Sequence, residues 1–299
     1  MSSKSHHFNS QVYLRRFMSP KAKNELWEYD LTTGAVRKSS PQESGCEDYY
    51  NSVALQGGGR DDDTIEKAFH PIENDLPKLF KATRNKQPMT DNLWSIFFAF
   101  IAIQHARCPS TVSSIHNFEC EIHQAVFEML CKGSPDFQKG LVGLGVEPHK
   151  ALDEFEMQAS QGSGLLLSLQ TVQDIVKIFR AMKWIFLCAS LGKYFLTSDK
   201  PVCNWVPPKE RKIYSGGFTD AKTRITFPLT KEICAFGTRG ASTRPLYNPM
   251  TADNVDLINF RTIMNSRQFV YGPVMDTNVK AVVEKIAHSQ NLSKIKKHD

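Results

Sequence analysis

A strongly apolar run at residues 93–103, near the middle of the chain, constrains the fold more than any other feature. It is much shorter than the roughly 20 residues that a helix needs to cross a bilayer, so we expect it in a protein core and predict no membrane contact. The polar residues Gln104 and Arg107 follow it directly. A helix that is apolar on nearly all sides is buried nearly all round. The sequence therefore predicts a globular protein built around this helix, with polar groups at the helix end.

Composition places the chain among ordinary globular proteins. Of its 299 residues 41% are hydrophobic and 23% are charged, which allows one large core. The N-terminus MSSKSHHFNS lacks the apolar segment of a secretory signal. The seven cysteines are odd in number and contain no CxxC pair, so we interpret them as reduced thiols. These features predict a cytoplasmic protein.

Helical and strand-like segments are separated along the chain. Apolar spacing and capping residues predict helices near 64–80, 90–107, 110–132, 171–191, 251–265 and 278–288. Short runs predict strands at 12–17, 25–29, 194–197, 224–229, 232–237 and 269–272. This order predicts an α+β fold in which a helical bundle packs beside a mixed sheet formed by N- and C-terminal segments.

We expect one α+β domain over 1–299. It would comprise a β-rich segment at 1–60, a helical part at 61–192, a β/α part at 193–290 and a basic tail at 291–299. The helices at 90–107 and 171–191 carry the most apolar residues, so we expect them to pack on each other. Seven side chains are predicted to form the core of this contact: Phe97, Phe98, Phe100, Ile101, Trp184, Ile185 and Leu187.

Polar residues that folding alone does not require occur first near the N-terminus. His6 and His7 point in different directions on an extended chain, so one could exchange protons while the other packs, although a solvated terminus is an alternative. We expect both to serve activity and not folding. Arg15 and Arg16 lie in the segment predicted as a strand, whose alternation turns one of them inward. A buried arginine needs an anionic partner.

Acidic residues form the second candidate group. Glu47 lies in a predicted loop, and Glu66 and Glu73 lie two turns apart on one face of a predicted helix. Such carboxylates could hold a metal, act as a base or form ion pairs with Arg15, Arg16 or Arg107. Residues 41–80 hold nine acidic and three basic side chains, whereas residues 207–244 hold eight basic and three acidic ones. The basic region could attract phosphate or nucleic acid, or could be a solvated loop.

Two further places complete the set. Gln104 and Arg107 are three residues apart at the end of the apolar helix, where polar groups must find partners. That partner is a bound carboxylate or phosphate, or one of the glutamates in an internal ion pair. Ser198 and Asp199 end a predicted strand before Pro201, where they could orient a ligand or simply form a turn.

These places together resemble the family known as domain of unknown function 4238. The opening HHFNSQVYLRRF is similar to the family pattern HHxxPxxYLRxF, with Ser10 where the family has proline. IEKAFHPIE, QHARCP, LTSDKPV, TFPLT and INFRTIMNSR follow in the family's order, so the resemblance runs from His6 to about Tyr271. It supplies no activity. It implies that ten residues match motif positions: His6, His7, Arg15, Glu47, Glu66, Glu73, Gln104, Arg107, Ser198 and Asp199.

Two functional hypotheses follow. The first is a phosphodiester-cleaving enzyme, a nuclease acting on RNA or DNA and serving as a toxin or defence effector. The catalytic residues would be His6, His7, Glu47, Glu66 and Asp199, and the substrate-binding residues would be Arg15, Glu73, Gln104, Arg107 and Ser198. A divalent metal, Mg²⁺ or Mn²⁺, is compatible with this chemistry.

The second hypothesis is a non-catalytic module that binds nucleotide, nucleic acid or protein. The same side chains would then form a structural ion network. A water-accessible cleft with a histidine and two carboxylates would favour catalysis, whereas a dry and fully paired network would favour structure. The chain lacks HExxH, GxSxG and GxGxxG, so zincin, α/β-hydrolase and dinucleotide-binding functions gain no support.

Overall fold

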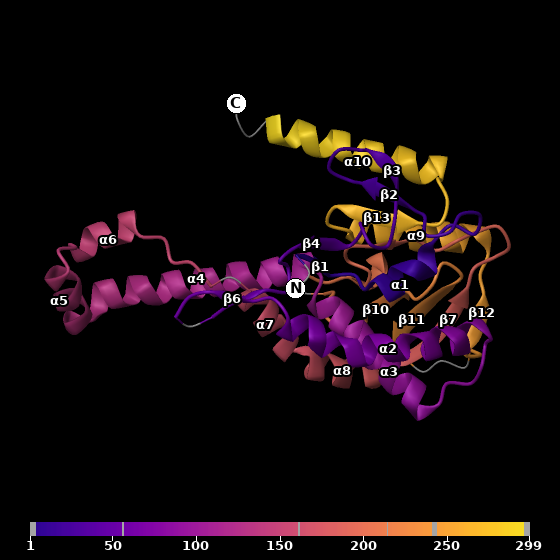
Figure 1. The fold of residues 1–299 in the computed structure, drawn as a ribbon, viewed down its shortest axis with the longest axis horizontal. Coiled ribbons are helices and arrows are strands. Elements are labelled where there is room, and N and C mark those ends of the chain that lie inside the picture. Colours follow the sequence, from indigo (N-terminus) through magenta and orange to yellow (C-terminus); the bar gives the residue numbers. More distant parts are fainter. Residues whose placement is uncertain (1–3, 56, 161, 214, 241–243, 296–299) are drawn as a thin grey trace.

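A computed structural model describes residues 4–295 except 56, 161, 214 and 241–243. The fold is α+β, as predicted: the middle of the chain, residues 64–180, forms helices α2 to α8, and the segments before and after it form the sheets (Figure 1). Residues 296–299 of the basic tail predicted at 291–299 lie outside the described residues, and the backbone of 291–295 belongs to the last helix. In the part of the chain that the structure describes, no helix combines the length and apolarity needed to cross a membrane.

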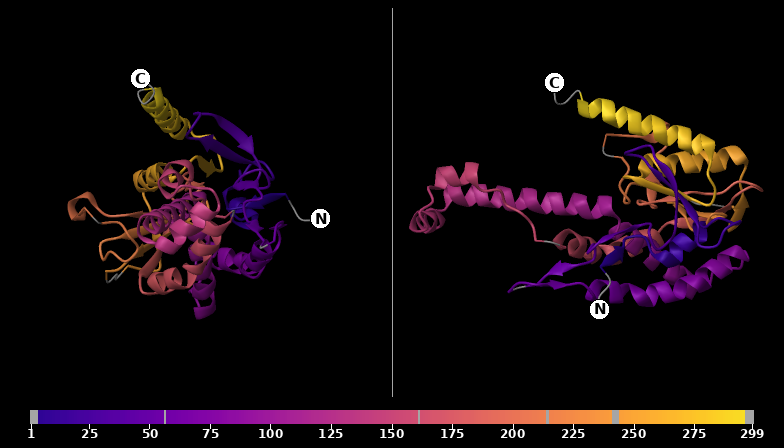
Figure 2. Two further views of the ribbon diagram at one scale, coloured as in Figure 1. Left: turned by 90° about the vertical axis from the view of Figure 1, so that its left-hand side faces the viewer. Right: turned by 45° about the horizontal axis from the view of Figure 1, so that its top comes forward.

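A four-stranded antiparallel sheet joins the two ends of the chain, which confirms the predicted mixture of terminal segments. Its order is β3 (Val36–Ser39), β2 (Leu26–Asp30), β13 (Phe269–Gly272) and β8 (Thr197–Ser198). The C-terminal helix α10 (Thr277–Ile295) lies along β2 and β3 (Figure 2). Its Val279 and Val283 pack with Tyr29 and Val270 of the sheet.

A five-stranded sheet forms the larger layer. Its order is β12 (Tyr247–Pro249), β7 (Lys183–Cys188), β11 (Ile233–Thr238), β10 (Arg224–Pro228) and β9 (Cys203–Trp205). Only the β12–β7 pair is parallel among these pairings. Helix α9 (Ala252–Asn265) covers one face. Helix α3 (Asp91–Ala106) covers the other through Phe97, which packs edge-on against Trp184.

The central helices begin where the sequence predicts. Helix α2 spans Thr64–Arg84, and α3 spans Asp91–Ala106 with the Thr90 hydroxyl accepting from the Leu93 N–H. Helices α7 (Ser163–Gln170) and α8 (Val172–Arg180) lie beside them. The remaining short elements are β1 (Ser5–His7), α1 (Gln11–Leu14), η1 (Arg15–Phe17), β4 (Cys46–Asp48), β5 (Val53–Ala54), β6 (Arg60–Asp61) and η2 (Pro208–Glu210).

Helix α4 (Pro109–Gly133) projects from the rest of the molecule and carries α5 (Pro135–Gly143) and α6 (Pro148–Glu154) at its outer end (Figure 1). We call α4, α5 and α6 the arm. The outer end has its own small core around Phe127, Cys131 and Ala151.

Three predicted elements are wrong. The strand predicted at 194–197 is reduced to Thr197, the first residue of β8, because residues 194–196 form no strand. Residues 12–17 form α1 and η1 and not a strand, because Tyr13 and Phe17 are one helical turn apart and their rings pack at 5.2 Å. The helix predicted at 171–191 ends at Arg180, and the strand β7 follows. A strand that is buried on both faces has a continuous apolar run, which the sequence pattern does not distinguish from a buried helix.

The predicted core residues are all buried. They lie, however, on two sides of the five-stranded sheet. Trp184 faces α3, whereas Ile185 and Leu187 face α9 together with Phe195 and Val255. Side chains alternate between the two faces of β7, so this one strand contacts α3 on one face and α9 on the other. This arrangement replaces the predicted contact between a helix at 90–107 and a helix at 171–191.

Candidate functional site

A pocket of about 460 Å³ opens beside the N-terminal strand β1. Strand β1 pairs with β4 so that His6 lies opposite Glu47. The start of α2 and the loop before it form the other wall. We call it the histidine pocket, and its lining consists of Ser5, His6, His7, Gln11, Gln42, Asp62, Asp63, Glu66, Lys67 and His70.

His6 forms the inner wall of the histidine pocket and is only 1% exposed. Its Nδ1 accepts a hydrogen bond of 3.0 Å from the Asn51 backbone N–H, so the proton of the neutral ring lies on Nε2. That Nε2 is buried and has no hydrogen-bond partner among the described residues. The Asn51 side chain donates to Glu66 at 2.6 Å and so links His6 to the carboxylate.

His7 is half-buried and has the geometry of a base. Its Nε2 lies 3.2 Å from the backbone oxygen of Gln42, and because a carbonyl can only accept, Nε2 carries the proton and Nδ1 keeps its lone pair. Burial lowers the pKa of His7, and the hydrogen bond to Gln42 and the charge of Glu66 only partly oppose it. His7 is therefore neutral at neutral pH and able to accept a proton.

The carboxylates of the histidine pocket are not equivalent. Asp62 pairs with Arg60 and accepts from Ser52, and Asp63 pairs with Lys67 at 2.8 Å. These contacts neutralise two of the three acids that line the pocket. Glu66 accepts from Asn51 and forms no ion pair within the described ranges. Among the residues that the structure describes, no group of three or more His, Cys, Asp or Glu side chains could hold a metal ion.

Arg107 lies behind the histidine pocket in a buried network. It is 2% exposed, pairs with Glu73 at 3.3 Å and donates to Gln104 at 3.2 Å. Gln104 in turn donates to the backbone oxygen of Phe8 at 2.9 Å and to the Asn9 side chain. Phe8 and Asn9 follow His6 and His7 directly in the chain. The network thus holds the chain that leaves β1, and its ion pair is the internal one that the sequence left as an alternative.

Ser198 and Asp199 act on the backbone and do not line the histidine pocket. The Ser198 hydroxyl accepts from the Lys200 N–H at 3.1 Å, while the Ser198 carbonyl accepts from the Asn9 side chain at 2.8 Å. Burial raises the pKa of Asp199 despite three backbone donors to its carboxylate. The donors are the N–H groups of Arg267, Gln268 and Phe269, at 2.7–2.9 Å. Asp199 therefore holds the turn into β13.

The ten predicted site residues do not line a single pocket. His6, His7 and Glu66 come together in the histidine pocket, and Glu47 is exposed opposite His6 but outside the lining. Arg15 lines a different cavity. The others belong to the buried networks described above: Glu73, Gln104, Arg107, Ser198 and Asp199.

Several pocket residues are missing from the sequence prediction. His70 lies one helical turn after Glu66 on α2, and this i, i+4 spacing is a signal that could have identified it. Asp62 and Asp63 lie directly before α2, where the sequence predicts neither a helix nor a strand. Gln42 reaches the pocket because β4 pairs with β1. No pattern in the neighbouring sequence predicts the pairing of β1 with β4.

The burial of His6 corrects the expectation that both histidines serve activity alone. A His6→Ala variant is expected to lose about 2–3 kcal/mol of unfolding free energy, because the Asn51 N–H loses its buried acceptor and a cavity remains. Urea unfolding monitored by circular dichroism measures this loss. His7→Ala, which removes a half-buried ring, should lose less than half as much. Equal losses for the two variants would contradict the different burial of the two rings.

The chain was compared with protein families, with curated proteins and with solved structures. No curated protein and no solved structure matches it. One family model, described as "Protein of unknown function (DUF4238)", matches residues 5–273 and so covers β1, the histidine pocket, the buried network and both sheets. The chain therefore belongs to the DUF4238 family.

Proposed function

We propose that the protein is a phosphodiester-cleaving enzyme acting on RNA or DNA, with the histidine pocket as its catalytic centre. The observation that carries this proposal is His7: a ring kept neutral by burial, in a pocket of about 460 Å³ that also contains Glu66 and His70. A solvent-reachable pocket with a histidine and two or more carboxylates is the arrangement expected of acid–base catalysis.

His7 accepts a proton from the attacking hydroxyl or water as the new phosphorus–oxygen bond forms. His70, exposed on α2, is placed to give a proton to the leaving oxygen as the other phosphorus–oxygen bond breaks. Lys67 pairs with Asp63 in an exposed contact, and its ammonium offers positive charge to a phosphate that displaces this partner. Glu66 acts as a positioning residue, because Asn51 connects it to His6 at the inner wall.

Arg107 is not assigned the role of phosphate clamp. Its guanidinium is bound to Glu73 and Gln104 and lies outside the lining of the histidine pocket.

The proposal also includes activation by Mg²⁺ or Mn²⁺, a role as a toxin or defence effector, and a cytoplasmic location. The second candidate is a non-catalytic binding module, and the Glu73–Arg107–Gln104 network favours it, because the Arg107 guanidinium is 2% exposed and is engaged by Glu73 and Gln104 inside the fold.

A His7→Gln variant is expected to cleave nucleic acid at least about 100-fold more slowly than the parent chain, since glutamine cannot serve as a base. Labelled RNA, single-stranded DNA and duplex DNA are each incubated with purified protein, in parallel with EDTA, Mg²⁺ and Mn²⁺. The parent rate should stay high down to a pH below about 6.5, the ordinary histidine value, because the lowered pKa keeps His7 unprotonated there.

His149→Gln is the matched control. His149 has a side chain that is 76% exposed and lies on α6 of the arm, so the same chemical change there should leave the rate unaltered. A parent chain that cleaves none of these substrates, or a His7→Gln variant with the full rate, refutes the enzymatic proposal. Binding without cleavage would support the non-catalytic module.

A further inference from the structure

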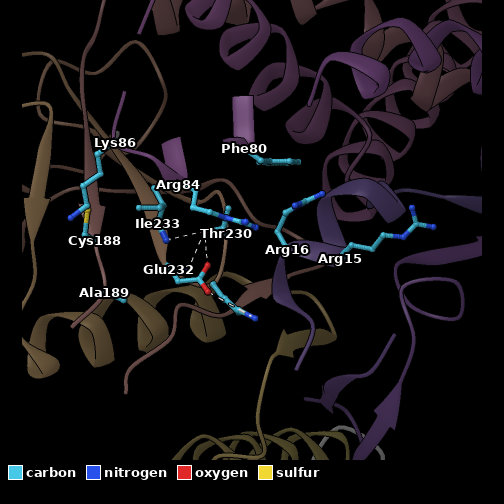
Figure 3. Close-up of a pocket in the computed structure, with 11 residues that line it drawn as sticks. Arg15, Arg16, Phe80, Arg84, Lys86, Cys188, Ala189, Thr230, Glu232 and Ile233 are labelled. Atoms are coloured by element: carbon cyan, nitrogen blue, oxygen red, sulfur yellow. Dashed lines mark hydrogen bonds and ion pairs between the residues drawn. The ribbon is translucent and has the colours of Figure 1, made fainter. Parts of the chain in front are cut away.

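A second cavity, of about 400 Å³, lies where η1, the end of α2 and the β10–β11 turn meet (Figure 3). Cations from these three separate segments line it, and we call it the basic pocket. Its charged lining consists of Arg15, Arg16, Arg84, Lys86 and Lys231, with Glu232 as the one carboxylate among the lining residues. The basic region at 207–244 that the sequence singled out contributes only Lys231 to this cation group.

The charges of the basic pocket are poorly compensated. Arg16, Arg84 and Lys86 form no ion pair with any described residue, and Lys231 donates to the backbone oxygen of Met18 while lying 3.9 Å from Glu232. Like charges this close repel one another unless an anion lies between them. The folded chain thus concentrates positive charge at a cavity without supplying the matching negative charge.

Arg16 shows the clearest need for a ligand. Its Cζ lies 4.9 Å from the centre of the Phe80 ring, and its Nε is buried without a hydrogen-bond partner in the described part of the chain. Burial lowers the pKa of Arg16, followed by the charges of Arg84 and Arg15, and Glu232 only partly opposes them. An anion that accepts from this guanidinium would satisfy the unpaired donor and offset the repulsion.

The shape of the basic pocket suits a phosphate with an attached group. Planar guanidinium groups bind two phosphate oxygens at once. Phe80, Ile233 and Cys188 supply apolar wall next to the cations, and burial raises the pKa of the Cys188 thiol, so it contributes wall and not a nucleophile. The volume lies within the range of small-ligand sites.

More than one phosphate is needed to reach all the cations. Figure 3 shows Arg84 extending toward Arg16, while Arg15 points away from both. Arg15 instead donates to Gln11 at 3.2 Å, and Gln11 lines the histidine pocket one helical turn earlier. Arg15 and Gln11 therefore form a continuous polar path between the two pockets.

We propose that the basic pocket binds the phosphate backbone of a single-stranded nucleic acid, and that a phosphodiester further along the same strand reaches the histidine pocket. The second part of this inference rests on the proposed function, whereas backbone binding does not. Arg16 and Arg84 hold one phosphate, and Arg15 guides the strand across α1 toward Gln11 and His7. Contacts of this kind are independent of base sequence and sensitive to salt.

Fluorescence anisotropy with labelled oligo(U) and oligo(dT) of about 12 nucleotides tests backbone binding without requiring cleavage. The double variant Arg16→Gln/Arg84→Gln should bind at least 10-fold more weakly than the parent, roughly the effect of losing two phosphate contacts. When the logarithm of its binding constant is plotted against the logarithm of the salt concentration, the slope should be shallower than the parent's by the amount expected for about two phosphate contacts. Lys132→Gln/Lys139→Gln removes the same charge from exposed positions on the arm and should change binding less than about two-fold. The exposed single variant Lys86→Gln gives a weaker effect in the same direction and is free of folding problems.

Equal binding by the pocket and arm variants, or no binding by the parent, overturns the inference. Inorganic phosphate, AMP and ATP are added as competitors. Competition by a mononucleotide as strong as by the oligonucleotide would also overturn it, in favour of a free-nucleotide site. Binding that depends on Arg16 and Arg84 in a chain that cleaves nothing refutes the proposed function and keeps backbone binding, whereas cleavage unaffected by the pocket variant refutes this inference alone.

Discussion

An Ile101→Asp variant is expected not to fold. Ile101 is fully buried in α3, in the core cluster that joins this helix to the five-stranded sheet. An aspartate there would place an unpaired charge among apolar side chains, which costs several kcal/mol, a large fraction of the roughly 5–15 kcal/mol that stabilises a typical protein. Insoluble protein on expression, or loss of the cooperative melting transition, is the measurable result.

Ile122→Asp provides the matched control for this substitution. Ile122 is 45% exposed on α4 of the arm, so the new carboxylate can remain in water. That variant should be soluble and melt within a few degrees of the parent. If Ile101→Asp melted at the parent temperature as well, α3 would not be the centre of the core.

Arg107→Met should lose about 3–5 kcal/mol of unfolding free energy, the usual loss when one member of a buried ion pair is removed. Methionine keeps much of the volume, but it leaves the Glu73 carboxylate without its cation and the Gln104 side-chain oxygen without a donor. The stacking of the guanidinium on Phe69, at 4.8 Å, is also lost. Urea unfolding measures the difference in free energy.

A second substitution separates the ion pair from the loss of packing. Adding Glu73→Gln to Arg107→Met removes the uncompensated charge, so the double variant should regain part of the lost stability. Lys132→Ala, in an exposed pair with Glu128 on the arm, should have an effect below about 1 kcal/mol. A double variant less stable than Arg107→Met would show that Glu73 is stabilised by something other than Arg107.

The elements that the sequence predicted best are those whose signals are local. Helix α3 combines an apolar run with a capping threonine, and α9 begins after Thr251, which caps it in the same way. Strand β7 could not be identified in this manner, because Trp184 and Ile185 meet apolar partners on opposite faces and leave no alternation. The sequence contained the apolar residues but not the second layer that made them a strand.

The same distinction, between local sequence signals and contacts made by distant segments, applies to the candidate site. His6, His7 and Glu66 could be chosen from the sequence because they match motif positions of the family that it resembles, and the structure brings all three to one pocket. The separation of Arg107 from the histidine pocket depends on its burial beside Glu73, which no spacing reveals. One of Arg15 and Arg16 was expected to turn inward and to need an anion. In the structure the Nε of Arg16 is buried without a hydrogen-bond partner among the described residues, although the segment is helical and not the predicted strand.

The pairing of β2 with β13 also sets the order of events during synthesis. The N-terminal strands leave the ribosome first, yet their partner β13 begins at Phe269, and Asn9 donates to the carbonyl of Ser198. These contacts join distant parts of the chain, and such contacts form late and slowly. Strand β2 therefore has only β3 as a partner for most of translation, whereas β1 and β4 can pair early. A prematurely terminated product therefore contains β1, β4 and every residue that lines the histidine pocket, but it lacks β13, the strand that joins β2 to β8.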